Sequence, residues 1–198
     1  NIKIHSSDEE GNIFKNKNYI LDFCKKNKNK KIDIIEIHNR PEYVKYIKKY
    51  FPKTKIILIY HNDPVMLRGS EKLIERENLL NICSKIIFVS KWIQSRFFYQ
   101  FMNSNYLDTE VINPGIKIPK ITKFKKNKNI LFVAKFNEAK GYHIFVEAAK
   151  KFKKYDKSWN FIAIGDEPRK KIFPDKNIIN EIGYKSNKEV LDYYSKSV

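Results

Sequence analysis

Cysteine is scarce in this chain. Of 198 residues only two are cysteines, Cys24 and Cys83, and they stand far apart in the sequence. They form no CxxC pair and no disulfide framework of the kind that small secreted proteins use. We therefore expect the protein to work in a reducing compartment, the cytoplasm.

Long apolar runs are also absent. A helix that spans a bilayer needs ~20 consecutive apolar residues, whereas the longest candidates here, such as residues 56–60, have the length of a strand. The chain begins at Asn1 without an initiating methionine or a signal-peptide pattern, and it ends directly after a helical pattern. We expect no membrane-spanning helix, and we expect the chain to be a fragment that is cut at both ends.

Acidic residues are few, with 22 Asp and Glu against 40 Lys and Arg, and the formal net charge is +18. Such a charge often indicates a nucleic-acid or membrane partner. Here the lysines are spread along the chain among asparagine and isoleucine, as at residues 25–31 and 123–129. No aromatic and basic binding motif accompanies them. We do not expect nucleic acid, whereas peripheral contact with an anionic membrane on its inner face fits this charge.

Short apolar runs that suit buried strands recur along the whole chain. We expect strands at residues 1–5, 33–37, 55–60, 85–89, 109–112, 130–134, 160–165 and 178–182.

Helical patterns lie between these runs. We expect the first helix at residues 16–26, burying Ile20, Phe23 and Cys24, and the second after Pro41, with an apolar stripe of Val44, Ile47 and Phe51. Later helices are expected after the N-caps Ser70, Ser90 and Ser186 and after Gly141. The helix after Ser90 is expected to present the apolar residues Trp92, Ile93, Phe97 and Phe101. For the helix after Gly141 they are Phe145, Ala148, Ala149 and Phe152, and for the helix after Ser186 they are Val190, Leu191, Tyr193 and Tyr194.

Strands that alternate with helices predict an α/β protein with mainly parallel sheets. The composition turns basic and loses its periodicity at residues 116–129, which indicates a linker. We predict two Rossmann-like domains, 1–118 and 119–198, the first incomplete at its start and the second truncated at its end.

A loop with two lysines follows the strand predicted at residues 130–134. Lys135 comes directly after the strand, and Lys140 and Gly141 precede the next helix. Open α/β sheets bind ligands at the carboxyl ends of their strands, and a helix N-terminus there attracts anions. The loop therefore predicts capture of a phosphate or diphosphate. The alternative is that both lysines are simply solvated.

The order of the motifs carries a resemblance. DIIEIHN is followed by a strand that ends at His61, then by KIIFVSKW, VINPGI, ILFVAKFNEAKG and FIAIGD. This order, over about residues 33–194, resembles the retaining glycosyltransferases of family 4, which have the GT-B fold. The resemblance implies an N-terminal domain that holds the acceptor and a C-terminal domain that holds a nucleotide-sugar.

The resemblance also assigns the donor residues. Lys135 stands where the family usually has the arginine of a Gly-Arg pair, and Lys140 with Gly141 matches the family's Lys-Gly. In the family these basic groups hold the donor diphosphate, whose developing negative charge needs nearby cations. Lysine in place of arginine loses the bidentate fork and keeps a point charge. No convincing DxD-like carboxylate pair is present, so we expect neither a metal ion nor a cofactor, only the nucleotide-sugar substrate.

His61 matches a family histidine at the end of an N-domain strand, close to the transferred sugar, and it is our predicted catalytic residue. Five further residues, His38, Asn39, Arg40, Asn62 and Asp63, either contact the acceptor and sugar or cap the following turns. Gly165 either brings the backbone close to the nucleotide or serves a tight turn.

The resemblance implies sugar transfer from a nucleotide-sugar to an acceptor with retention of configuration. A lipopolysaccharide, another surface glycan or a lipid-linked saccharide is the expected acceptor. The family's first glycine-rich loop is missing, since Gly11 matches it poorly, and its acidic motif is expected after Val198, so we expect the fragment alone to be inactive. The alternatives are a non-catalytic protein that binds nucleotide or polyanion, and a sugar-nucleotide epimerase.

Overall fold

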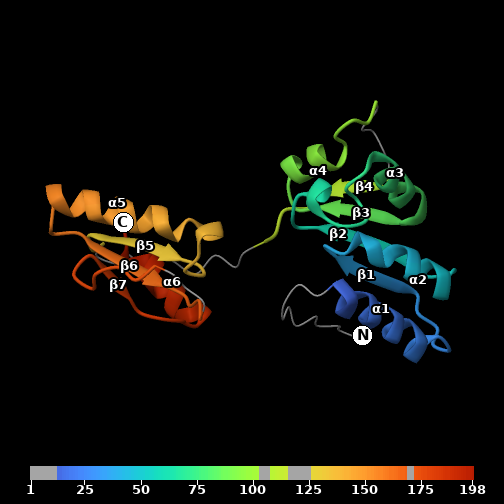
Figure 1. Ribbon diagram of the computed structural model, residues 1–198, viewed down its shortest axis with the longest axis horizontal. Coiled ribbons are helices and arrows are strands. Elements are labelled where there is room, and N and C mark those ends of the chain that lie inside the picture. Colours follow the sequence, from blue (N-terminus) through green and yellow to red (C-terminus); the bar gives the residue numbers. More distant parts are fainter. Residues whose placement is uncertain (1–12, 103–107, 116–125, 169–171) are drawn as a thin grey trace. The chain divides into compact units, whose positions relative to one another are not determined.

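The computed structural model describes residues 13–102, 108–115, 126–168 and 172–198. They form two compact units, which divide between positions 116 and 117. Each unit contains one parallel β-sheet with helices packed against it (Figure 1). The predicted α/β class with parallel sheets is therefore confirmed. The strand predicted at residues 1–5 and most of the predicted linker lie outside the described residues.

The first unit is built on a four-stranded parallel sheet in the order β1-β2-β3-β4. The strands are β1 (Ile34–His38), β2 (Lys55–Tyr60), β3 (Lys85–Phe88) and β4 (Thr109–Val111). The helices are α1 (Ile13–Asn27), η1 (Pro41–Tyr43), α2 (Val44–Tyr50), η2 (Pro64–Met66), α3 (Leu73–Ile82) and α4 (Lys91–Phe97).

The core of this unit lies between the sheet and one layer of helices. Because the strands follow one another in a single direction, right-handed crossovers place α2, α3 and α4 on the same face of the sheet. The burial of β2 fits this arrangement, since Ile56, Leu58 and Tyr60 are fully buried while Ile57 and Ile59, which point to the other face, are only half-buried. The predicted stripe of α2 is confirmed, with Val44, Ile47 and Phe51 in the core.

The predicted start of α3 was wrong. Ser70 is not its N-cap, because Lys72 occupies that position and the helix starts at Leu73. The Ser70 hydroxyl is buried and donates to the carbonyl of Pro64 at 2.6 Å. The residue therefore closes the loop before the helix.

The predicted apolar face of α4 was wrong at two positions, because Trp92 is exposed and Phe101 lies beyond the end of the helix at Phe97. Ser90 caps the helix as predicted, accepting from the amide of Ile93, and Ile93 and Phe97 are buried. Trp92, however, is 59% exposed. It lies next to Ile93 in sequence, and neighbouring positions on a helix point about 100° apart, so both cannot face the sheet.

The second unit has the sheet order β5-β6-β7, again parallel. Its strands are β5 (Asn129–Val133), β6 (Asn160–Ile164) and β7 (Ile179–Glu181), and its helices are η3 (Glu138–Lys140), α5 (Tyr142–Tyr155) and α6 (Asn187–Lys196). Within this unit α5 covers one face of the sheet and α6 lies on the other (Figure 1). The capping box that opens α6, between Ser186 and Glu189, is confirmed.

The chain beyond α6 returns to the free side of β5. Ser197 forms a parallel bridge with Asn127, and the Val198 amide donates to the carbonyl of Asn129. Strand β5 therefore has β6 on one side and this terminal segment on the other. The strand order reverses at β5, and such a reversal is where open α/β sheets form their ligand crevice.

The predicted apolar face of α5 was partly wrong. Tyr142, Val146 and Ala149 are the buried residues, whereas Ala148 is exposed and Phe152 is 39% exposed. Because the helix already starts at Tyr142, its buried stripe begins with that tyrosine. The Tyr142 hydroxyl also donates to a carboxylate oxygen of Glu181, which ties α5 to β7.

Candidate functional site

The carboxyl edge of the first sheet brings two histidines into contact. His38 ends β1, and His61 follows the last residue of β2. In the parallel register His38 lies opposite Ile59, so His61 is one alternate position further along the same face. Nδ1 of His38 lies 2.9 Å from Nε2 of His61, and the two rings are nearly parallel. A hydrogen bond therefore joins His61, the predicted catalytic residue, to His38, a predicted contact of the acceptor or sugar.

Asn39 holds the backbone of the same loop. Its φ of 52° is in the left-handed region, which asparagine tolerates better than most residues. Its side-chain oxygen accepts hydrogen bonds from the amides of His61 at 2.7 Å and Asn62 at 3.1 Å. The structure thus brings together His38, Asn39, His61 and Asn62, four of the residues singled out in the sequence. Their contacts show that Asn39 supports the loop after β2.

The capping alternative is confirmed for Asp63 and not for Arg40. Arg40 stands at the N-cap position of η1 but makes no side-chain cap, and its guanidinium donates to the carbonyl of Asn39 at 3.2 Å. Asp63 caps η2 by accepting from the amide of Val65 and also pairs with Arg96 at 3.0 Å. This ion pair, which sequence reasoning missed, ties the loop after β2 to α4.

The electrostatics of the histidine pair favour a neutral His61. Partial burial lowers the pKa of His61, and the neighbouring His38 lowers this pKa further. On the other side of His38, its Nε2 lies 3.8 Å from Oε2 of Glu36. Sequence reasoning missed Glu36, although its position two residues before His38 on a strand puts both side chains on one face.

The second sheet presents its lysines at the end of β5. Lys135 follows this strand in the loop, and both Lys135 and Lys140 are exposed. Neither forms an ion pair with the residues that the structure describes. Gly141 is left-handed, with φ of 75°, and stands at the N-cap position of α5. The loop therefore places two cations beside a helix N-terminus at the edge where the strand order reverses.

Asn137 holds together the loop between β5 and α5, residues 134–141, which we call the lysine loop. Sequence reasoning missed this residue. Its side chain accepts a hydrogen bond from the Lys140 amide at 3.1 Å and donates to Glu167 at 3.2 Å. One residue thus caps η3 and joins the loop after β5 to the loop after β6. The available signal was an Asx residue three positions before Lys140 at a helix start.

Gly165 follows β6, where the backbone passes very close to the end of β5. Its φ is 146°, and a Cβ placed there would lie 2.0 Å from the carbonyl oxygen of Ala134. Its amide donates to the carbonyl of Gly183 at 3.0 Å. Gly165 is therefore required by the close approach of two loops, and this approach fixes the residue before Lys135.

A cavity of about 460 Å³ lies elsewhere in the first unit, beside α2 and α3. Its lining includes apolar Pro41, Val44 and Leu79 and charged Arg68 and Lys72. None of the predicted site residues lines it. The candidate site is thus formed at the sheet edges and not in this cavity.

Two searches of the described residues found no further site. In the ranges 13–102, 108–115, 126–168 and 172–198, no three His, Cys, Asp or Glu side chains gather in a way that could hold a metal ion. In the same ranges, none of the helices has both the length and the apolar character needed to cross a membrane.

Residues 116–197 match the family described as glycosyl transferases group 1. The match is shorter than half of the chain, but it contains β5, the lysine loop, Gly165 and α6. No protein of curated function matches the sequence.

Solved structures resemble the chain more widely. S. aureus TarM is similar over 85% of this chain and 37% of its own, with a TM-score of 0.64 and 17% identity. Anabaena Alr3699/HepE in complex with UDP and glucose is similar over 94% of this chain and 56% of its own, with a TM-score of 0.63 and 13% identity. S. aureus MnaA, solved with UDP, is similar over 100% of this chain and 57% of its own, with a TM-score of 0.56 and 13% identity.

These likenesses establish the fold. The chain has the α/β architecture with two parallel sheets seen in GT-B glycosyltransferases, as predicted. It spans about a third to just over half of the length of the structures it resembles.

Proposed function

We propose that the intact protein is a glycosyltransferase that moves a sugar from a nucleotide-sugar to an acceptor, with retention of configuration and without a metal ion or other cofactor. The observation that carries this proposal is the lysine loop. It lies where the strand order of the second sheet reverses, inside the segment that matches glycosyl transferases group 1. The likeness to structures solved with UDP supports a nucleotide-sugar donor.

On the donor side, Lys135, Lys140 and Gly141 would hold the diphosphate. The departing nucleoside diphosphate gains negative charge, which fixed cations stabilise at the moment of bond breaking. The first amides of α5 would add hydrogen bonds to the same oxygens. Gly165 has no side chain, so the nucleotide could approach the backbone at this position.

On the acceptor side, His61 would hydrogen-bond a sugar hydroxyl near the reacting carbon. Among the residues around it, the side-chain oxygen of Asn39 already accepts hydrogen bonds from two backbone amides, and Nδ1 of His38 contacts His61. Asn62 is therefore the best remaining residue to contact the acceptor saccharide, together with Arg40. We propose a saccharide of a surface glycan, free or lipid-linked, as the acceptor.

The protein's place in the cell belongs to the same proposal. A cytoplasmic enzyme whose net charge is +18 would be drawn to the anionic inner face of a membrane, where lipid-linked acceptors lie. This contact would be peripheral and sensitive to salt.

Substitution of Lys140 tests the donor assignment. In the intact protein, Lys140→Ala should weaken UDP binding by about 10-fold to 100-fold, because a charge-assisted contact is worth about 1.5–3 kcal/mol. Calorimetry with UDP measures the change, and an assay of sugar transfer from UDP-sugars should show at least the same loss. GDP and ADP should be titrated in parallel to identify the base.

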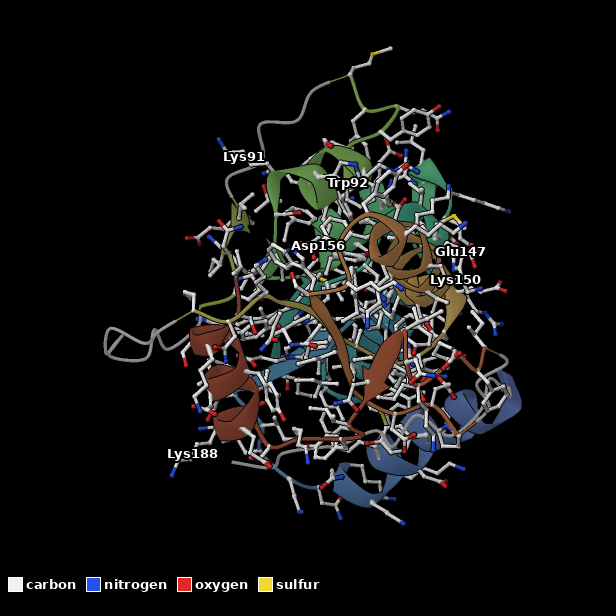
Figure 2. The ribbon with its side chains drawn as sticks, turned by 90° about the vertical axis from the view of Figure 1, so that its left-hand side faces the viewer. Lys91, Trp92, Glu147, Lys150, Asp156 and Lys188 are labelled. Atoms are coloured by element: carbon white, nitrogen blue, oxygen red, sulfur yellow. The ribbon has the colours of Figure 1, made fainter. Side chains whose placement is uncertain are left out.

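A second lysine provides the matched control. Lys150 and Glu147 lie together on α5 (Figure 2) and form an ion pair at 2.8 Å, away from the loop. Lys150→Ala should leave nucleotide affinity unchanged. Unchanged affinity and transfer in Lys140→Ala would refute the donor site, and a product of inverted configuration would refute retention.

The second candidate function is non-catalytic binding of a nucleotide or polyanion. Only the net charge favours it, because it gives no reason for the lysine loop to lie in the segment that matches the family. The salt dependence of the binding affinity distinguishes this candidate from the glycosyltransferase.

A further inference from the structure

The histidine pair at the edge of the first sheet has a chemistry of its own. A distance of 2.9 Å between two imidazole nitrogens is a hydrogen bond, so one proton lies between Nδ1 of His38 and Nε2 of His61. Either ring can donate it, depending on the tautomer. Among the described residues, Nδ1 of His61 has no hydrogen-bond partner, and this nitrogen remains for a ligand.

Glu36 decides the tautomer of the neutral pair. Its carboxylate lies 3.8 Å from Nε2 of His38, on the side away from His61. The negative charge favours a proton on that nitrogen, which leaves Nδ1 of His38 as an acceptor. His61 then donates from Nε2, and its Nδ1 carries a lone pair that can accept a hydrogen bond from a ligand hydroxyl.

One added proton reverses which histidine donates the hydrogen bond between the two rings. It would be held on His38, between the carboxylate of Glu36 and the ring of His61. His38 then donates from both nitrogens, Nε2 of His61 becomes an acceptor, and the His61 proton moves to Nδ1. The cation stays off His61 because burial and the neighbouring ring lower the pKa of His61.

Three other charged side chains near the loops after β1 and β2 have partners of their own. Among the described residues they are Arg40, whose guanidinium bonds to the carbonyl of Asn39, and the ion pair of Asp63 with Arg96. The charges of Asp63 and Arg96 compensate each other at 3.0 Å. Glu36 is thus the one described carboxylate within 4 Å of either ring.

We propose that Glu36 and His38 form a proton relay that sets whether the outer nitrogen of His61 accepts or donates a hydrogen bond. His38 is then a positioning residue for His61. This inference deepens the proposed function and rests on it for the identity of the ligand. In the neutral relay the outer nitrogen suits a hydroxyl group and not a phosphate oxygen, which cannot donate.

NMR of the imidazole nitrogens in the intact protein tests the relay between about pH 5 and about pH 8.5. At the basic end His61 should be protonated on Nε2. As pH falls, His38 should become the cation while His61 stays neutral and changes to the Nδ1-protonated tautomer. A His61 that keeps one tautomer, or that becomes the cation first, would overturn the proposal.

Two variants separate the parts of the relay, and both change exposed side chains. His38→Asn keeps a polar group at the position of Nδ1 but cannot take up a proton, so the neutral form of His61 should keep one tautomer throughout the titration. Glu36→Gln removes the carboxylate, and the tautomer change should move to lower pH. If His61 in His38→Asn still switched as in the unmodified protein, His38 would not be the relay.

The spectra need no substrate, so their outcome does not depend on sugar transfer. A relay without sugar transfer would overturn the proposed function alone. Sugar transfer with a fixed His61 tautomer would overturn the relay alone. In the transfer assay, His38→Asn should remove the acidic limb of the pH profile of kcat/KM.

Discussion

At the scale of single residues, glycine and asparagine control the two sheet edges. Gly165 allows the loop after β6 to touch the end of β5, and Asn39 allows the chain after β1 to hold the loop after β2. Both residues have positive φ values, which few other residues adopt at low cost. Their conformations support the residues that we expect to bind ligand.

Gly165 gives a prediction at this scale. Gly165→Ala should lower the free energy of unfolding by more than about 2 kcal/mol, because the new Cβ must displace the carbonyl of Ala134 and the backbone conformation is strained. Urea unfolding measures the change. Nucleotide affinity should fall as well, because Ala134 precedes Lys135.

Gly183 is the matched control for this substitution. It also has a positive φ, of 72°, but a Cβ there would meet no atom within 4 Å. Gly183→Ala should therefore cost only the backbone strain, about 1 kcal/mol. Equal losses in the two variants would show that the contact with Ala134 is unimportant.

At the scale of elements, one buried arginine fixes the start of α3. Arg76 is fully buried, and its guanidinium donates to the carbonyls of Ser70, Glu71 and Tyr99 at 2.8–3.0 Å. It thereby joins the loop before α3 to the segment after α4. A planar fork with several donors suits such a set of carbonyls.

The prediction at this scale is that Arg76→Lys destabilises the first unit. A single ammonium group cannot replace the fork, so carbonyls lose their partners at about 1–3 kcal/mol each. Denaturant unfolding should show a loss of about 3 kcal/mol. Arg68→Lys, on the exposed part of the preceding loop, should change stability by less than about 0.5 kcal/mol. Similar values for both variants would contradict this account.

At the scale of the whole molecule, the net charge of +18 separates the two candidate functions. Binding of a polyanion releases counterions, so its affinity should fall by about 1000-fold or more between about 50 mM and about 200 mM salt. A pocket for one diphosphate makes few ionic contacts, and its affinity for UDP should fall by less than about tenfold over this range. Titration of UDP and of heparin at both salt concentrations measures the difference.

Heparin affinity that falls steeply with salt, together with no UDP binding, would favour the non-catalytic candidate as a polyanion-binding protein. The reverse pattern would favour the glycosyltransferase.

The sequence by itself located most of the strands and helices along the chain. Short apolar runs and helical stripes are local signals, and they located β2 with its full bounds and the stripe of α2. Motif order placed Lys135, Lys140 and His61 at the carboxyl ends of strands, because chain direction alone decides which end of a parallel strand a residue follows.

Only the tertiary structure decided which side chains meet. Ser70 has the appearance of a cap in sequence, but the fold buries it against Pro64. His38 and Asn39 contact His61 from the end of a neighbouring strand, and Asn137 bonds to Glu167 across two loops. The contacts of His61 with His38 and Asn39, and that of Asn137 with Glu167, join residues more than 20 positions apart. They depend on strand pairing and register, which no local pattern encodes.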